Sequence, residues 1–219
     1  MPKISPSARR ALTEQRKAQI LTAAAKVFAA KGFERATIAD IARAAGVAEG
    51  SIYNYFKNKS DLLVSIPRQF VEPAVESISG QMFATAAAPL TPEETLTTVA
   101  RTMLATVRQN AHIFRILISS IPSMKQAARE KYLNQVVMYA TGRLETYFGE
   151  QIKQGVFRSD LDARIAARAF IGMFFPFVLL QDVLQVEGPG QFDYEKVIPA
   201  CVRLFLRGAV VDAAERKTR

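Results

Sequence analysis

The chain has 219 residues, of which 49% are apolar and 22% are charged, a composition typical of a globular protein with an ample core. Its one cysteine, Cys201, excludes an internal disulfide and a thiolate metal cluster and fits a reducing cytoplasm. The N-terminus lacks the apolar segment of a secretory signal, and the longest apolar run, Ala169 to Leu180, is too short to span a bilayer.

The net charge of +9 is unevenly distributed along the chain. Residues 1–59 hold 11 Lys and Arg against 4 Asp and Glu, so most of the basic excess lies in the first quarter of the sequence. Such segregation is typical of a nucleic-acid-binding module joined to a nearly neutral second domain. The alternative is a basic face that serves only solubility.

The first residues predict an arm followed by a helix. Residues 1 to about 12 are small, polar and basic, and we expect a flexible arm that either lies along DNA or has no role. Thr13 is the expected N-cap of a helix that runs to about Lys31, where Gly32 and Phe33 form a glycine-terminated end.

Two short helices around a glycine turn are predicted next. Thr37 and Asp40 have the spacing of a capping box, and Gly46 has the position of a left-handed helix end. A second helix is expected from about Ala48 to Tyr55, and we place Ile52 on its inner face together with Ala48 and Phe56. Together these features predict a helix-turn-helix.

The outer face of that second helix has the chemistry of a DNA-reading surface. Gly50, Ser51 and Asn54 point outward, and small hydrogen-bonding residues of this kind can contact base edges. Tyr53 and Tyr55 flank them and can reach phosphates. Helix pairs around a glycine also occur in helical proteins that never touch DNA, so the pattern by itself leaves that alternative open.

The rest of the chain predicts further helices and no strands, giving an all-α fold of about nine helices. Ser60 and Asp61 are the expected start of the fourth helix, and Pro67 is expected to kink or break it. The later helices are expected at Thr91 to about Gln109, a short one ended by Pro122, about Lys125 to Lys153, Asp160 or Asp162 to Leu184, and about Asp193 to Val211.

The residues around the glycine turn resemble those of a known family. The run G-V-x-x-G-S-I-Y-N-Y-F-K-N-K, preceded by T-I-A-D-I-A and followed by S-D-L-L, resembles the DNA-binding domain of the tetracycline-repressor (TetR) family of bacterial transcription regulators. The resemblance extends from about Gln15 to Leu63. It implies an N-terminal three-helix DNA-binding domain, residues 1–59, and a C-terminal helical ligand-binding and dimerisation domain, residues 60–219.

The resemblance also implies partners. They are an operator in double-stranded DNA, a small-molecule effector, and a second copy of the chain paired through the last two helices, with no membrane involved. Those helices are apolar on more than one face and need cover, although a monomer with an internal central helix is the alternative. The predicted DNA-binding residues are Thr37, Glu49, Gly50, Ser51, Tyr53, Asn54, Tyr55, Lys57 and Lys59.

The resemblance implies a small molecule held among the helices of the C-terminal domain. The candidate ligand residues suit an apolar or aromatic molecule, although the same apolar residues occur in the core of any helical domain. They are Met103, His112, Phe114, Arg115, Gln135, Tyr139, Arg143, Met173, Phe174 and Phe177.

Neither catalysis nor a cofactor is expected. The chain has one histidine and one cysteine, and the sequence motifs of the common enzyme classes and metal sites do not occur in it. We therefore expect a ligand-responsive transcriptional regulator, most simply a repressor, released from a palindromic operator by a largely apolar molecule. The alternative from another class is an apolar-ligand carrier or interaction protein with an incidental basic surface.

Overall fold

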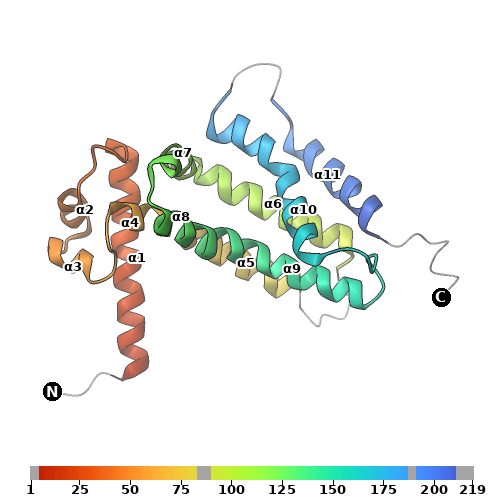
Figure 1. Ribbon diagram of the computed structural model, residues 1–219, viewed down its shortest axis with the longest axis horizontal. Coiled ribbons are helices and arrows are strands. Elements are labelled where there is room, and N and C mark those ends of the chain that lie inside the picture. Colours follow the sequence, from red (N-terminus) through yellow and green to blue (C-terminus); the bar gives the residue numbers. More distant parts are fainter. Residues whose placement is uncertain (1–4, 83–89, 187–190, 211–219) are drawn as a thin grey trace, which may run out of the picture. The chain divides into compact units, whose positions relative to one another are not determined.

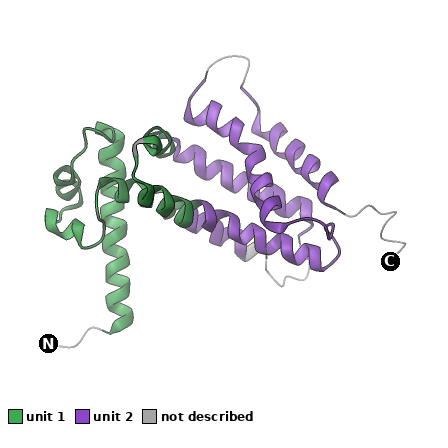
Figure 2. Ribbon diagram, viewed as in Figure 1, with its two compact units in different colours: residues 1–70, 112–136 green, residues 71–111, 137–219 purple. Residues whose placement is uncertain are grey.

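The computed structural model describes residues 5–82, 90–186 and 191–210, and most of these residues are helical (Figure 1). Within them no strand forms, apart from an isolated antiparallel bridge between Phe157 and Val210. The described chain divides into two compact units (Figure 2). Unit 1 comprises residues 1–70 and 112–136, and unit 2 comprises residues 71–111 and 137–219. A segment from the middle of the chain thus joins the N-terminal helices, so these units differ from the expected domains 1–59 and 60–219.

The described residues of unit 1 form six α-helices, a short 3₁₀ turn and most of a π-helical segment. They are α1 (Pro6–Lys31), α2 (Ile38–Ala45), α3 (Glu49–Tyr53), α4 (Lys59–Ser65), α7 (Ala111–Ser120, in unit 1 from residue 112), η1 (Ile121–Ser123), α8 (Gln126–Tyr132) and η2 (Leu133–Val137, in unit 1 to residue 136). Helix α1 packs against α2 and α4, α2 packs against α3, and α4 packs against α8. One continuous core includes Phe28 from α1, Ile41 from α2, Ile52 from α3, Leu63 from α4 and Leu117 from α7.

Two expected helix starts in unit 1 were wrong. Helix α1 begins at Pro6, with Ser5 as its N-cap, so the arm expected over residues 1 to about 12 is helical from residue 6; residues 1–4 lie outside the described chain. Thr13 lies inside α1 and donates its hydroxyl to the Arg9 carbonyl. Helix α4 is capped by Asn58, whose side chain accepts from the Asp61 N–H.

Unit 2 surrounds an aromatic core. Its elements are α5 (Arg68–Met82, in unit 2 from residue 71), α6 (Pro92–Gln109), α9 (Met138–Lys153), α10 (Ala163–Phe177), η3 (Val178–Val183) and α11 (Tyr194–Ala209). Thr91 caps α6 in a capping box with Glu94, and Asp162 and Asp193 cap α10 and α11. At the centre Phe148 stacks on Phe205, with ring centroids 5.3 Å apart.

Two helices expected to be regular contain π-helical segments. The helix expected from Lys125 to Lys153 is one helical run, but Leu133–Val137 within it is π-helical. A second π segment, η3, follows α10. Such segments are frequently found at functional sites. Pro67 lies in the break between α4 and α5, as expected for a proline that cannot continue a helix.

Helix α10 with η3 is the most apolar run of the described chain. Ala163–Val183 spans 21 residues with a mean hydropathy of 1.7, which by length and composition alone is enough to cross a membrane. Core and interface helices of water-soluble proteins can have the same composition. The side chains of Ile165, Phe175 and Leu180 on this run are 67%, 56% and 49% exposed, and Leu204 on α11 is 63% exposed. Unit 2 therefore presents large apolar side chains to the outside.

Candidate nucleic-acid interface

The start of α2 is fixed by the predicted capping box. The Asp40 N–H donates to Thr37 Oγ1 over 3.1 Å, and the Thr37 N–H donates back to Asp40 Oδ2 over 3.2 Å. Lys31 at the end of α1 donates to Asp40 Oδ1 over 2.7 Å. These hydrogen bonds, first that from Lys31 and then those from Thr37, lower the pKa of Asp40 to about 2. The carboxylate thus ties α1 to the start of α2.

The turn between α2 and α3 is the predicted left-handed glycine end. Gly46 has φ 63° and ψ 38°, a conformation that costs other residues energy, and its N–H returns to the carbonyls of Ala42 and Arg43. Gln19 of α1 donates to the Ala45 carbonyl over 2.7 Å and fixes the end of α2. The angle at which α3 leaves the turn is therefore set by backbone and side-chain hydrogen bonds.

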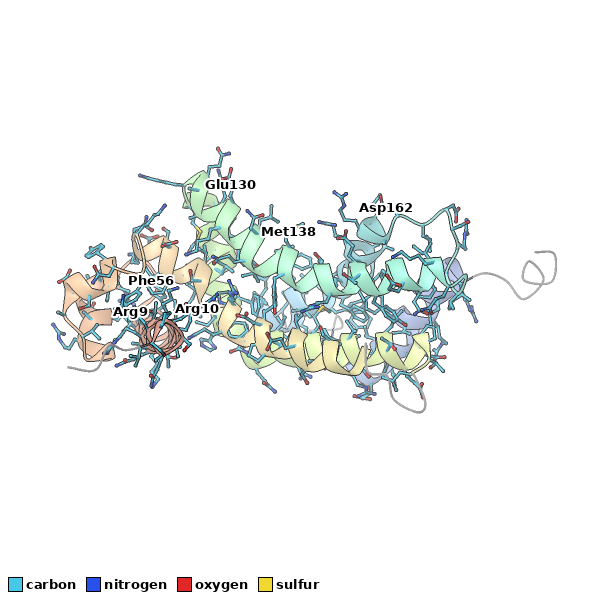
Figure 3. All side chains as sticks on the ribbon, turned by 90° about the horizontal axis from the view of Figure 1, so that it is seen from below. Arg9, Arg10, Phe56, Glu130, Met138 and Asp162 are labelled. Atoms are coloured by element: carbon cyan, nitrogen blue, oxygen red, sulfur yellow. The ribbon has the colours of Figure 1, made fainter. Side chains whose placement is uncertain are left out.

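Helix α3 presents the predicted polar face outward. Ile52 is fully buried and Phe56, labelled in Figure 3, is 4% exposed, so these two residues anchor the helix. Gly50 and Asn54 are exposed, and Tyr53 is 55% exposed. The residues placed on the outer face from sequence therefore share one surface, with Ser51 half-buried at its edge.

Two residues of this segment differ from the expectation. Ala48 is exposed instead of buried, because it is the N-cap of α3 with φ −67° and ψ 144° and the helical angle does not extend to it. Tyr55 is half-buried and packs against the unit 1 core, so part of its ring contacts the protein itself. Glu49, in the first turn of α3, is exposed.

The two lysines that follow α3 have different surroundings. The side chain of Lys57 is exposed, whereas the Lys59 ammonium donates to the carbonyls of Glu34 and Ala36 over 3.0 and 3.1 Å. The same ammonium lies 4.5 Å from the centroid of the Phe33 ring. Lys59 therefore ties α4 to the loop before α2, and at most one of its N–H groups is left for a phosphate.

The structure adds one cationic side chain, Arg43, that the sequence reasoning did not assign to DNA, and it changes the setting of Arg9 and Arg10 from the expected arm to a helix. Arg43 on α2 is 81% exposed and lies 3.8 Å from Asp40. Arg9 and Arg10, labelled in Figure 3, lie in the exposed first turns of α1, because that helix begins earlier than expected. The first helix of a helix-turn-helix crosses the DNA backbone, so the spacing of Arg43 from Thr37 could have indicated it.

Comparison with known proteins identifies both parts of the chain. Residues 20–66 match the model of bacterial regulatory proteins of the tetR family. Residues 94–208, more than half of the chain, match that of the AefR-like transcriptional repressor C-terminal domain. The chain belongs to the TetR family. Helix α3 and its exposed surface lie within the part of the chain that matches the family's N-terminal model.

Two relatives of known function extend this assignment. The regulator is 28% identical over 158 residues to the fatty acid metabolism regulator protein of Bacillus subtilis (strain 168), covering 70% of this chain and 77% of that protein. It is 28% identical over 156 residues to the transcriptional repressor KstR2 of Rhodococcus jostii (strain RHA1), covering 70% and 73%. The chain is a ligand-responsive, DNA-binding transcriptional repressor, and the carrier alternative has no support from these relatives.

A solved structure shows the same fold with a ligand. The transcriptional regulator FadR of Bacillus subtilis in complex with stearoyl-CoA is 25% identical, with a TM-score of 0.67, covering 87% of this chain and 97% of that one. FadR of Bacillus halodurans is 27% identical with a TM-score of 0.66 over the same shares.

The predicted ligand residues divide between the two units. His112 and Arg115 of α7 are exposed in unit 1, where Phe114 packs against Phe70 at 5.6 Å and Gln135 is half-buried in η2. The others belong to unit 2, in which Arg143 is exposed, Phe174 is fully buried and the rest are half-buried: Met103, Tyr139, Met173 and Phe177.

Phe174 has the surroundings of a core residue. Its ring meets Phe170 at 5.4 Å, within the aromatic cluster centred on Phe148. Phe177 packs edge-on against Phe192 at 5.1 Å, nearer the surface. A ligand could therefore reach Phe177 more readily than Phe174.

The described residues offer little for metal chemistry. Among them no group of three or more His, Cys, Asp and Glu side chains is placed to hold a metal ion. Burial raises the pKa of the Cys201 thiol, so less of it is present as the thiolate that binds metal ions. The TetR family, to which the chain belongs, is a family of transcription regulators.

Proposed function

We propose that the protein is a homodimeric repressor that reads a palindromic operator through two copies of α3 and leaves it when a long-chain acyl-CoA binds. The proposal rests on the exposed surface of α3, which is held in place by the buried side chains of Ile52 and Phe56 and by the turn at Gly46. A dimer with two-fold symmetry would place the helices in successive major grooves, about 34 Å apart.

Within each half-site the residues divide by chemistry. Ser51 and Asn54 are proposed to contact base edges, because their short side chains can donate or accept, and Gly50 is proposed to let the backbone approach the bases closely. Tyr53, Tyr55 and Lys57 are proposed to contact phosphates, together with the hydroxyl of Thr37 and the remaining N–H of Lys59. Glu49, at the start of α3, can accept a hydrogen bond from a cytosine amino group.

The proposed dimer forms through α10, η3 and α11. Ile165, Ala169, Gly172, Phe175 and Leu180 are exposed at spacings that keep them on one side of the helical run. Leu204 adds an exposed leucine on α11. A stripe of large apolar and small side chains is suited to close packing against its own symmetry copy. This arrangement would explain why so apolar a helix is left uncovered in one chain.

The proposed effector follows from the relatives. A fatty acid metabolism regulator and a FadR structure bound to stearoyl-CoA suggest a thioester with a long apolar tail and an anionic head. The apolar candidates on α6 and α10 suit the tail, and exposed arginines such as Arg143 suit the phosphates. The repressor would act in the cytoplasm, where both DNA and acyl-CoA occur.

The test is a fluorescence anisotropy titration with duplex DNA from upstream of the protein's own gene. Tight binding, with an affinity that falls as salt rises, is expected for the proposed repressor. Palmitoyl-CoA should release the DNA, whereas free coenzyme A or palmitate alone should be much weaker. DNA binding without release by any acyl-CoA would refute the effector, and no DNA binding would refute the operator.

A further inference from the structure

The carboxylate of Asp61 connects the turn that follows α3 to helix α8, which lies far away in the sequence. Asp61 Oδ1 accepts from the Lys131 ammonium over 2.6 Å, and the side chains of the two residues are only 13% and 26% exposed. The ammonium also lies 5.7 Å from the ring centroid of Phe56, one of the two residues that anchor α3. The ion pair is therefore packed against the end of the reading helix.

The second oxygen of the same carboxylate holds the backbone that leaves α3. Asp61 Oδ2 accepts the Lys57 N–H over 2.8 Å, and the Asp61 N–H donates to Asn58 Oδ1 over 2.9 Å. Residues 57–61 thus form one hydrogen-bonded turn whose central acceptor is oriented by Lys131. If the lysine were removed, the carboxylate would lose its charged partner and the turn would lose one of its fixed points.

We propose that Lys131 is a positioning residue for DNA binding, acting through Asp61 to hold the exit turn of α3 in its reading orientation. The inference rests on the proposed use of α3 to bind DNA. Through this ion pair, α8 contacts the turn after α3 directly, in addition to the backbone connection that α4 provides. Lys131 itself does not need to touch the DNA for this role.

The test compares Lys131→Met, Asp61→Asn and the double variant by anisotropy on the upstream duplex. Methionine keeps the apolar stem over Phe56 and removes only the charge. Each single variant should bind about tenfold more weakly, in the range of typical coupling energies. The double variant should be no weaker than either single one, because both remove the same interaction. Lys131→Arg should retain most of the affinity.

Two further readouts separate positioning from phosphate contact and from loss of fold. The salt slope should stay unchanged in Lys131→Met, whereas loss of a phosphate contact would reduce it by about 1 and overturn the proposal. Hydrogen exchange of the Lys57 amide should accelerate in both single variants without DNA. It should not change in the matched control Lys153→Met, whose lysine pairs with Glu150 in an exposed i,i+3 contact.

The failure of this inference can be told apart from failure of the repressor assignment. If the unmodified protein binds the duplex and Lys131→Met binds equally well, the positioning role is refuted and DNA binding stands. If Lys57 exchange is unchanged in Lys131→Met, the ion pair does not hold the turn and the inference fails whatever the affinity. Absence of DNA binding by the unmodified protein would remove both proposals.

Discussion

Lys57 and Lys59 lie two residues apart after α3, yet we expect their replacement by alanine to affect different properties, stability for Lys59 and the salt dependence of DNA binding for Lys57. The Lys59 ammonium donates to two backbone carbonyls and faces an aromatic ring, so Lys59→Ala removes contacts that join α4 to the loop before α2. Hydrogen bonds from charged donors contribute about 1.5–3 kcal/mol each, and a cation–π contact at an exposed site about 0.5–1.

The net loss of stability is smaller than the sum of these contributions. Lys59 is only half-buried, so water can reach the carbonyls of Glu34 and Ala36 after the substitution. We therefore expect Lys59→Ala to lower the free energy of unfolding by about 2 kcal/mol. Lys57 has an exposed side chain, and Lys57→Ala should change the free energy of unfolding by less than about 0.5 kcal/mol.

Urea unfolding followed by circular dichroism measures both effects, with Lys26→Ala as a matched control on the exposed face of α1. A free energy of unfolding for Lys59→Ala within about 0.5 kcal/mol of the unmodified protein would refute the structural role. DNA titration at several salt concentrations completes the comparison. Lys57→Ala should reduce the salt slope by about 1, and Lys59→Ala should do so only if its remaining N–H reaches a phosphate.

Three other predictions concern Asn54, Asp40 and the proposed dimer face. Asn54→Ala should leave stability within about 0.5 kcal/mol and relax the preference at one operator position by about 1–3 kcal/mol, as measured on a panel of single-base variants. The pKa of Asp40 is lowered from its usual 3.8 to about 2, so its contribution to stability is present above pH 3.8 and is lost as the pH falls through about 2. Acid unfolding of Asp40→Asn should lack this component. Leu180→Glu with Leu204→Glu should halve the mass seen in sedimentation equilibrium, and an unchanged mass would exclude the proposed dimer face.

The sequence predicted best those features that depend on a few neighbouring residues. The capping box of α2 needs only Thr37 and Asp40, three positions apart, and the glycine turn needs only Gly46, so both were correct. The same local logic was available at Ser5 before Pro6 and at Asn58 before Asp61. Those caps were missed because the first lay in a segment interpreted as an arm and the second was assigned to Ser60.

The inner and outer faces of α3 were predictable only where the helix is regular. Ile52 and the outward Gly50 lie within α3 and follow from an angle of about 100° per residue. Asn54 and Phe56 lie just after α3, but the prediction still holds for them because the Phe56 N–H donates to the Ile52 carbonyl over 2.9 Å, as in a further helical turn. The prediction failed for Ala48, because α3 has five residues and its N-cap already has extended backbone angles. In so short a helix an error of one residue in its start changes which side chains are assigned to the core.

The roles of the charged residues near α3 could not be predicted, because they depend on partners far away in sequence. Lys59 contacts carbonyls 23 and 25 residues earlier, and Asp61 pairs with a lysine 70 residues later. From sequence alone, a basic residue next to a helix-turn-helix is interpreted as a phosphate contact, because the sequence gives its charge but not its neighbours in the fold. Because α8 packs against α4, the charge of Lys131 can instead hold the backbone turn next to the residues that are proposed to contact bases. We therefore expect the lysines near α3 to divide into those that bind DNA and those that orient the residues that do, and the salt dependence of DNA affinity is the measurement that distinguishes the two.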